Sequence, residues 1–268
     1  MPVEFGEVLD SVAPCGDGWS ATVPDDWTQG RTAYGGLQGA LLARAMRQVV
    51  RGAAELPLRS LQVTFVGPVR PGPVELRPAV LRRGRTAWQA RCDLLQDGSP
   101  ACTAVGIFGA PRSSRIAIEI ARPQAPAAPE DLRDLPFVPG VTPPFVQHVQ
   151  LRWALGRRSS PGGASEPHSM VYARLRDRRC TPEEALVALA DSIPTPALVL
   201  LEKPLPVSSL NWMLELIGDP AALDLADWSL LDTRVRAGAD GYLSQTSVLF
   251  GPSGHAFAVS HQTVAIFG

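Results

Sequence analysis

Three polar side chains that lie close in the sequence have the chemistry needed to hold a reactive water molecule. Asp191 is the one acid in the apolar run 185–191. Apolar and polar residues then alternate over 209–217, the pattern of a half-buried strand, which predicts that Ser209 and Asn211 point to one side. A carboxylate can accept a proton from water, and a hydroxyl and an amide can orient that water.

A well-capped helix is expected to carry Asp191 at its far end. Thr181-Pro-Glu-Glu184 has the sequence of a capping box with proline in the first turn. Pro194 and Pro196 end the same helix. A structural alternative stays open for both candidate groups: Asp191 as a helix-end residue that bonds a backbone N–H, and Ser209 as a satisfied strand hydroxyl.

Gln262 is a further candidate, on the last predicted strand, 256–267. Its face of that strand holds Ala258, Ser260, Val264 and Ile266, which are apolar or small. A buried glutamine there must have hydrogen-bond partners. The neighbouring His261 belongs to the opposite face, and no spacing of His, Asp or Glu predicts a metal site.

Gly35 and Gly36 open a predicted helix that runs to about Arg51. Glycines at this position let a ligand or another backbone approach the free N–H groups of the helix start. The alternative is an ordinary loop-to-helix joint. No Asp or Glu occurs between Gly30 and Ala54, so this helix cannot supply a carboxylate and we expect one site per chain.

The remaining elements predict an α+β fold. After the first helix, four strands are expected as an antiparallel meander rather than as alternating βαβ units. The second half repeats the order of one helix followed by strands. The predicted strands of the two halves cover 60–66, 73–82, 86–95 and 101–108, and then 145–153, 169–176, 209–217, 228–236, 242–250 and 256–267.

Two short matches support a tandem duplication. Ser60–Phe65 resembles Ser209–Leu214, and Ala104–Gly109 resembles Thr263–Gly268. Between the halves lies a proline-rich segment, which predicts an extended, semi-rigid linker with one strand at 116–120. The predicted organisation is residues 1–112, a linker at 113–142, and residues 143–268. The segment before Val23 is expected to be irregular or strand-like, and 159–164 a loop.

The bulk composition argues against several classes of function. A net charge of −1 gives no reason to expect nucleic acid as a partner. The four cysteines form no C-x-x-C pair, and the N-terminus has no apolar signal region, so we expect a reducing cytoplasm. No apolar run is long enough to predict a membrane span.

An ordered set of motifs resembles the bacterial acyl-CoA thioesterase II family. The set is Gly35-Gly36, Arg83-Gly-Arg-Thr86, Asp191, Ser209-Leu-Asn-Trp212 and Ser260-His-Gln262. The resemblance implies a double hot-dog, in which two long helices are each wrapped by an antiparallel sheet and the sheets join into one. It also implies an acyl-CoA substrate, no cofactor, and a water held by Asp191, Ser209 and Gln262.

The chain departs from the family pattern at two places near these residues. The family's Asp-His pair after the hydroxyl residue is Asn211-Trp212 here, and the Glu after the glutamine is Thr263. On this basis Gly35, Gly36 and Asn211 are predicted to contact substrate. The alternatives are a non-catalytic acyl or acyl-CoA binding protein and a hot-dog dehydratase, which commonly wants a histidine beside an acid. An exposed sheet edge favours a homodimer or higher oligomer.

Overall fold

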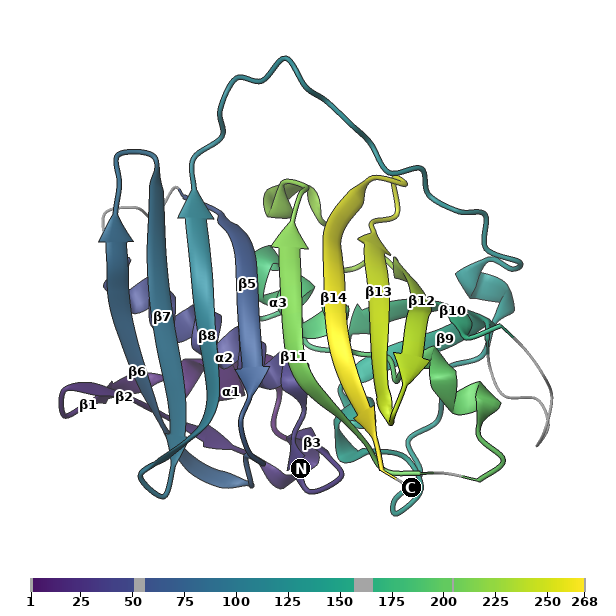
Figure 1. Ribbon diagram of the computed structural model, residues 1–268, viewed down its shortest axis with the longest axis horizontal. Coiled ribbons are helices and arrows are strands. Elements are labelled where there is room, and N and C mark those ends of the chain that lie inside the picture. The colour runs from purple at the N-terminus through teal and green to yellow at the C-terminus, as the bar shows by residue number, and fades with distance from the viewer. Residues whose placement is uncertain (1, 51–55, 157–165, 204, 268) are drawn as a thin grey trace.

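One antiparallel sheet organises the molecule (Figure 1). The computed structural model describes residues 2–50, 56–156, 166–203 and 205–267. In sheet order the twelve strands are β1 (Ala13–Cys15), β2 (Gly18–Val23), β6 (Gly72–Arg83), β7 (Ala87–Gln96), β8 (Ser99–Gly109), β5 (Leu58–Phe65), β11 (Val207–Leu216), β14 (Ala256–Ile266), β13 (Tyr242–Phe250), β12 (Ser229–Ala239), β10 (His168–Leu175) and β9 (Val149–Leu155). A separate hairpin pairs β3 (Thr28–Gln29) with β4 (Thr32–Ala33).

The helices lie against one face of this sheet (Figure 1). The α-helices are α1 (Phe5–Asp10), α2 (Gly35–Val49) and α3 (Pro182–Ala190). The short 3-10 segments are η1 (Asp25–Trp27), η2 (Pro129–Asp131), η3 (Pro144–Gln147), η4 (Pro196–Leu200) and η5 (Pro220–Ala222). None of the described helices is long and apolar enough to cross a bilayer.

The helix lengths correct part of the predicted fold. Whereas α2 has 15 residues, α3 has only nine, so the structure does not show two long helices. The capping box at Thr181 is present as predicted, with the Glu184 N–H donating to the Thr181 side chain. The prolines at 194 and 196 follow closely on α3 and disfavour its continuation. The entry segment, expected to be irregular or strand-like, begins instead with the helix α1.

The two halves meet at the strand pair β5–β11 and share one topology. The first half orders its strands 6-7-8-5 and the second 12-13-14-11, which is the same order read from the outside inward. The predicted repeat makes Val63 the counterpart of Trp212, and these two residues are directly opposed across the junction. A two-fold axis through that pair therefore relates the halves.

The second predicted match is displaced by one residue. Val63 pairs with Ala104, while its counterpart Trp212 pairs with Gln262. Ala104, and not Thr103, thus occupies the first-half position that corresponds to Gln262. Bulges in both β5–β8 and β11–β14 shift the local register, which the sequence match does not take into account.

One hydrophobic core contains side chains from both halves, because α2 and α3 pack directly on each other. Two glycines of α2 allow this close approach. A Cβ on Gly36 would lie 2.5 Å from the backbone oxygen of Ala188, and one on Gly39 would lie 3.0 Å from Val187 Cγ1. The predicted division at residues 112 and 142 stays a prediction.

The linker leaves the sheet as an arch and returns over the outer face of β10 and β12 (Figure 1). The strand predicted at 116–120 is wrong: this stretch has no regular structure, and Ile116 and Ile118 are 75% and 87% exposed. It has β-branched residues but pairs with no described strand. Further along, Leu132 packs against a small cluster that includes Met170 and Tyr172. The loop predicted at 159–164 lies outside the described residues.

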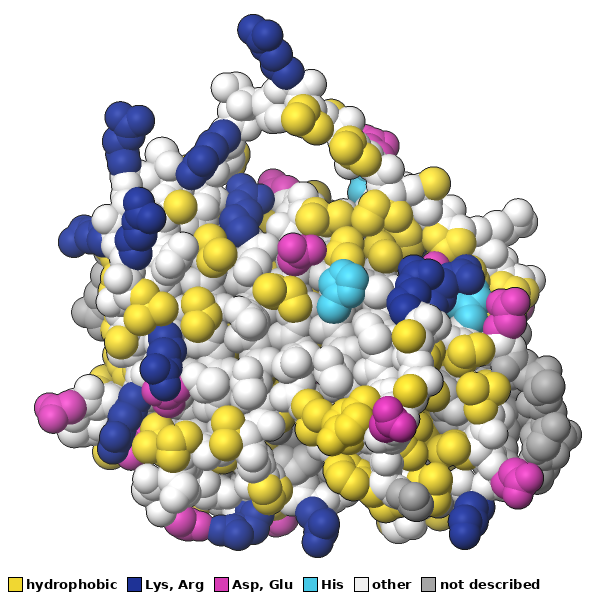
Figure 2. Space-filling model, viewed as in Figure 1, with side chains coloured by type: hydrophobic (Ala, Val, Ile, Leu, Met, Phe, Trp, Pro, Cys, Tyr) yellow, Lys and Arg dark blue, Asp and Glu magenta, His cyan; other side chains and the backbone are white. Residues whose placement is uncertain are grey.

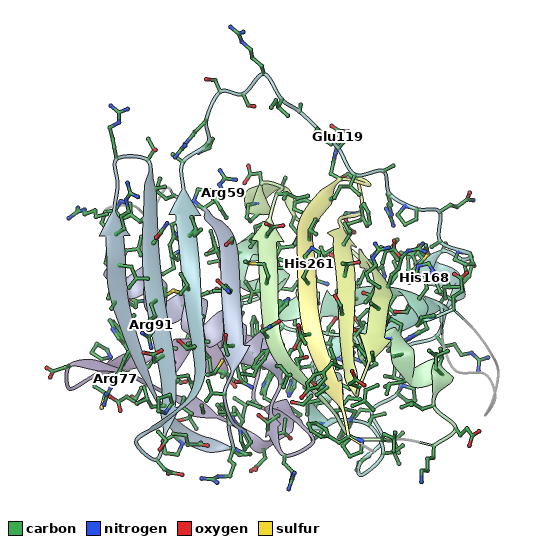
Figure 3. The ribbon with its side chains drawn as sticks, in the orientation of Figure 1. Arg59, Arg77, Arg91, Glu119, His168 and His261 are labelled. Atoms are coloured by element: carbon green, nitrogen blue, oxygen red, sulfur yellow. The ribbon has the colours of Figure 1, made fainter. Side chains whose placement is uncertain are left out.

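Charged side chains are unevenly spread over the outer face of the sheet. Arg59, Arg77 and Arg91 project from the first half, whereas His261 projects from the second (Figure 3). In the space-filling view most of the dark blue side chains on this face, which are Arg or Lys, lie over the first-half strands (Figure 2). The centre of this face carries few charged side chains (Figure 2).

Candidate active site

Asp191 is the first residue after α3, and its carboxyl group meets the start of α2. The Gly36 N–H donates to the carboxylate, and a Cβ on Gly35 would lie 2.6 Å from Asp191 Oδ2. Only glycine at position 35 leaves room for this contact. The two helices run antiparallel, so the positive end of the α2 dipole faces the acid.

The surroundings of Asp191 favour its neutral form. The residue as a whole is half-buried, but desolvation of the carboxyl group raises its pKa from 3.8 to about 7. The hydrogen bonds from Gln262 and Gly36 act in the opposite direction and do not cancel the effect of burial. A carboxyl group with a pKa near neutrality can exchange protons with a bound water, as a general base requires.

Gln262 reaches Asp191 from the sheet. It is buried on the helix-facing side of β14, and its Nε2 donates to Asp191 Oδ1 over 2.6 Å. The structure thus brings together two of the three residues predicted to hold water, although they are 71 positions apart in the chain. The predicted need for a partner of this buried amide is met.

A β-bulge separates Ser209 from Asn211, so the interpretation that both point to one side is wrong. Ser209 pairs with Val264, whereas Asn211 pairs with Thr263, and neighbouring residues of β14 face opposite sides. Ser209 therefore shares the Gln262 face. Asn211 is exposed on the outer face, where its Oδ1 accepts from the Thr263 N–H at 3.3 Å.

Ser209 lies on the same face of the sheet as Gln262 but is not hydrogen-bonded to the pair formed by Asp191 and Gln262 in the described structure. Ser209 is half-buried and lies one strand away from Gln262, diagonally across the β11–β14 ladder. Among the described residues no direct hydrogen bond joins its hydroxyl to Asp191 or Gln262. A molecule held between these groups would have to bridge them.

The opposite end of the helix pair is chemically different. There Arg47 Nη2 contacts Glu183 Oε2 at 2.5 Å, and Arg44 Nη1 contacts Glu184 Oε1 at 3.0 Å. The Leu58 N–H also donates to Glu183. Both carboxylates are engaged by arginine, and Ala104 stands where Gln262 stands in the other half. This arrangement fits the expectation of one site per chain.

Comparison with known proteins identifies the family of this chain. The family model described as the acyl-CoA thioesterase N-terminal domain matches residues 23–109, and that of the acyl-CoA thioesterase C-terminal domain matches residues 129–266. The chain belongs to the acyl-CoA thioesterase II family. A search of curated proteins finds no match.

Solved structures share the fold of this family member at low identity. A conserved hot-dog protein of unknown function from Alicyclobacillus acidocaldarius is 20% identical, with a TM-score of 0.84 over 100% of this chain and 99% of the other. A putative thioesterase II from Thermobifida fusca is 18% identical, with 0.82 over 100% and 99%. An acyl-CoA thioesterase II from Mycobacterium marinum is 18% identical, with 0.79 over 98% of each chain.

Gln245 is a site residue that the sequence reasoning missed. It lies on β13 directly across from Gln262, and its Nε2 donates to Gln262 Oε1 at 2.7 Å. Both amides are buried. In the sequence, Gln245 shares its strand face with Ser247 and Leu249, so its burial could have been predicted, but its partner depends on the register of β13 on β14.

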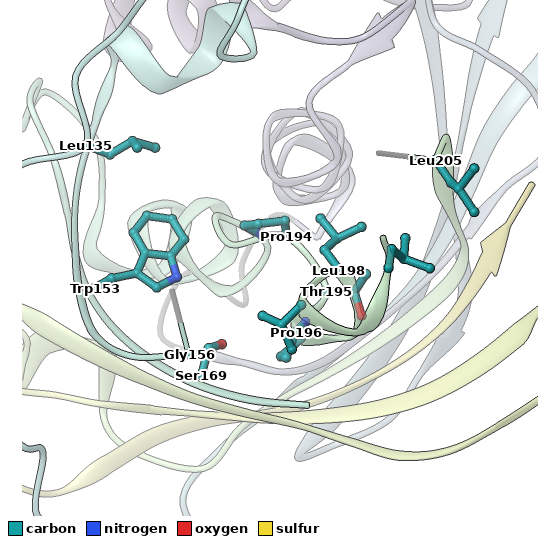
Figure 4. A pocket seen from close by; sticks show the side chains of 11 residues that line it. Leu135, Trp153, Gly156, Ser169, Pro194, Thr195, Pro196, Leu198 and Leu205 are labelled. Atoms are coloured by element: carbon teal, nitrogen blue, oxygen red, sulfur yellow. The ribbon is translucent and has the colours of Figure 1, made fainter. Parts of the chain in front are cut away.

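An apolar cavity of about 330 Å³ opens beside the segment that follows Asp191 (Figure 4). Its lining comes mainly from η4, β9 and the residues flanking them, among them Trp153, Pro194, Pro196 and Leu198. Ser169 and Thr195 are the polar residues of this lining, and the buried Ser169 hydroxyl has no hydrogen-bond partner among the described residues. A cavity of this kind suits an acyl chain better than a charged group.

Proposed function

We propose that this protein hydrolyses acyl-CoA thioesters to the free acid and CoA, with Asp191 as the general base. The observation that carries the proposal is the contact of Asp191 with Gln262 at the start of α2, in a member of a thioesterase family. Acyl-CoA is the proposed substrate, and no metal or cofactor enters the reaction.

In the proposed reaction, Asp191 removes a proton from a water molecule while the water oxygen bonds to the thioester carbonyl carbon. The tetrahedral intermediate then breaks its carbon–sulfur bond, and the CoA sulfur leaves with the proton that Asp191 accepted. Gln262 keeps one N–H free after bonding Asp191, so it can donate to the water or to the carbonyl oxygen. Backbone N–H groups in the first turn of α2, apart from the Gly36 N–H that bonds Asp191, can stabilise the developing negative charge.

Ser209 is proposed to be the third group, after Asp191 and Gln262, that forms a hydrogen bond to the water. Its half-buried hydroxyl shares the face of Gln262, and a bridging water would occupy its hydrogen-bonding capacity. Ser209→Ala should lower kcat by about tenfold, the size of losing one aligned hydrogen bond. Ser208→Ala is the matched control, since Ser208 is exposed and adjacent. Equal rates for both variants and the wild type would remove Ser209 from the site.

Asn211 is the least supported of the predicted substrate contacts. Because it lies on the outer face, its difference from the family aspartate does not alter the charge next to Asp191. Trp212 is fully buried on the inner face, and its ring lies 2.9 Å from where a Gly39 Cβ would be. Trp212 is therefore a residue of the hydrophobic core.

The dehydratase alternative finds little support. In the described structure, His168 and His148 each lie beside an acid, Asp232 and Asp26 respectively, but neither is on an α-helix. The pair formed by His168 and Asp232 belongs to the outer-face side of β10 and β12, away from Asp191. Hydrolysis by a carboxylate-held water therefore has the better geometry.

A panel of acyl-CoA thioesters and a thiol-detecting reagent test the proposal. The wild type should release CoA, and Asp191→Asn should lose at least about a hundredfold in kcat, as expected for removal of a general base. Binding of acyl-CoA without release would favour the non-catalytic binding protein. Full activity in Asp191→Asn would leave the hydrolase standing and overturn the assignment of Asp191.

A further inference from the structure

Gln245, Gln262 and Asp191 form a chain of hydrogen bonds with a definite direction. Gln245 Nε2 donates to Gln262 Oε1 at 2.7 Å, and Gln262 Nε2 donates to Asp191 Oδ1 at 2.6 Å. An ionised carboxylate only accepts hydrogen bonds, so Asp191 requires the NH₂ end of Gln262. The oxygen of Gln262 must then find a donor, and Gln245 supplies it.

A carboxamide can rotate by half a turn at little cost in shape, and then exchanges its donor for its acceptor. With its oxygen toward Asp191, Gln262 would repel the carboxylate and would have no donor to offer a water at that end. Nothing in Gln262 itself prevents this rotation. The buried donor of Gln245 opposes the rotation whether Asp191 is charged or neutral, because a rotated Gln262 would set its NH₂ group against that of Gln245.

We propose that Gln245 is a positioning residue that locks the Gln262 amide with its NH₂ toward Asp191. This inference rests on the proposed function and adds a residue to it. Gln245 itself touches neither Asp191 nor any atom assigned to the reaction. Among the described residues its own Oε1 is buried without a hydrogen-bond partner, so it has the capacity to accept a hydrogen bond from a solvent molecule.

The orientation of Gln262 has a measurable consequence for Asp191. The side chains facing Asp191 from β14 and β5 are Gln262 and Phe65, which are uncharged, and Tyr34 at the start of α2 is the ionisable group near it within the described residues. Burial, followed by the charge of Asp191, keeps the pKa of Tyr34 well above its ordinary value, so Tyr34 stays neutral. A change in the pKa of Asp191 in a Gln245 variant therefore reports a change in the orientation of the Gln262 amide.

Gln245→Leu and Gln245→Glu test the proposal, with Ser247→Ala as the matched control. Ser247 is buried on the same face of β13 and also takes part in a side-chain hydrogen bond, from Thr233, but it is paired with Ser260 and not with Gln262. In folded Gln245→Leu, kcat should fall about tenfold with KM unchanged, and the midpoint of the pH–rate profile should move up by about half a unit or more. Ser247→Ala should leave both quantities at the wild-type values.

Gln245→Glu preserves the shape of the side chain and covers the case in which the leucine variant fails to fold. Its neutral carboxyl can donate to Gln262, whereas its carboxylate cannot. Activity relative to the wild type should therefore fall as the pH rises. Relative activity that is independent of pH, together with an unchanged midpoint, would overturn the proposal.

An NMR titration of ¹³C-labelled aspartate separates this inference from the proposed function. The Asp191 signal, assigned by its loss in Asp191→Asn, should titrate at higher pH in Gln245→Leu than in the wild type even if no acyl-CoA is hydrolysed. An identical Asp191 titration in the two proteins would refute the positioning role. If the Asp191 titration differs between the two proteins as expected but the wild type releases no CoA, only the proposed hydrolase activity is refuted.

Discussion

Asp191 combines a desolvated carboxyl group with donors that still allow it to ionise. Burial raises its pKa, while Gln262 and Gly36 each donate a hydrogen bond that favours the charged form. The balance leaves the group close to neutrality, where a base is both sufficiently deprotonated and sufficiently basic. A carboxylate at the surface would be ionised but would accept a proton too weakly.

The pH dependence of hydrolysis follows from this balance. As the proposed general base, Asp191 would act only when deprotonated, so kcat/KM should rise with pH and level off above a midpoint of about 7. The measurement is the initial rate on one acyl-CoA across the pH range at constant ionic strength. A midpoint near that of an ordinary aspartate would show that the base is another group or is not desolvated.

Asp191→Asn should be more stable than the wild type at alkaline pH. The pKa of Asp191 in the folded state, about 7, lies above its ordinary value of 3.8, so its contribution to stability is complete below the lower value and is lost as the pH rises through the upper one. Asparagine carries no charge and avoids that loss. Denaturant unfolding should show a gain of roughly 1–3 kcal/mol at about pH 8 and little gain at about pH 4. A variant that is less stable at both pH values would contradict this account.

At this scale the sequence predicts residue types better than their partners. Asp191 and Gln262 stand out because each is a polar residue in an apolar face, and a buried polar group needs a partner. The opposite orientations of Ser209 and Asn211 depend on a bulge that no local pattern announces. Gln245 becomes visible only once β13 and β14 are in register.

The helix pair α2–α3 is the element that delivers these residues to one place. Its close contact depends on Gly36 and Gly39, whose missing side chains admit the backbone of Ala188 and the ring of Trp212. Tyr34 also bonds the Ala188 oxygen through its hydroxyl, and its ring stacks on Phe145. The position of Asp191 relative to α2 is therefore fixed on both sides of the contact.

Gly36→Ala should disturb both stability and activity. Its Cβ would lie 2.5 Å from the Ala188 oxygen and from the Tyr34 ring, so α2 or α3 must shift. We expect a loss of about 2 kcal/mol or more in the free energy of unfolding, as for other overpacked sites, and a lower kcat. Gly67→Ala is the control, because a Cβ there meets nothing within 4 Å. Similar losses in the two variants would show that the helix contact is not responsible.

Most strands and the start of α3 could be predicted, because alternation and capping are local signals. The strand β13 has the predicted bounds, Tyr242–Phe250. The strand expected at 116–120 is absent because strand formation is not determined by local sequence alone. Its composition is that of a strand, but a strand also needs a neighbouring strand to bond. The apolar content of α3 alone would allow a longer helix, but the prolines at 194 and 196 disfavour its continuation.

At the scale of the whole molecule, the two halves form one continuous sheet over one core. The junction β5–β11 is an ordinary antiparallel ladder, and α2 from the first half packs on α3 from the second. The repeated order of elements allowed the sequence to predict this duplication. The linker arch does not limit the contact, because it crosses over the second-half strands on the outer side.

The full chain should therefore unfold in a single cooperative transition. Neither half can lose its structure without exposing the shared apolar surface of Val63, Leu61 and Leu214 at the junction. Calorimetry should give equal calorimetric and van't Hoff enthalpies, and far-UV and near-UV circular dichroism should have coincident midpoints. Two resolved transitions would mean that the halves are energetically independent.

The two ends of the α2–α3 helix pair differ, because ion pairs occupy one end and Asp191 occupies the other. This difference affects how the sequence of such a protein can diverge. In a symmetric assembly of identical chains, every substitution appears at both ends of the helix pair at once. Covalent fusion removes that constraint, so the Arg47–Glu183 ion pair can hold the helices together at one end while Asp191 stays available for the proposed hydrolysis at the other. The destabilising effect of an ionised Asp191 at one end of the helix pair is tolerated because residues at the other end are free to stabilise the contact between the halves.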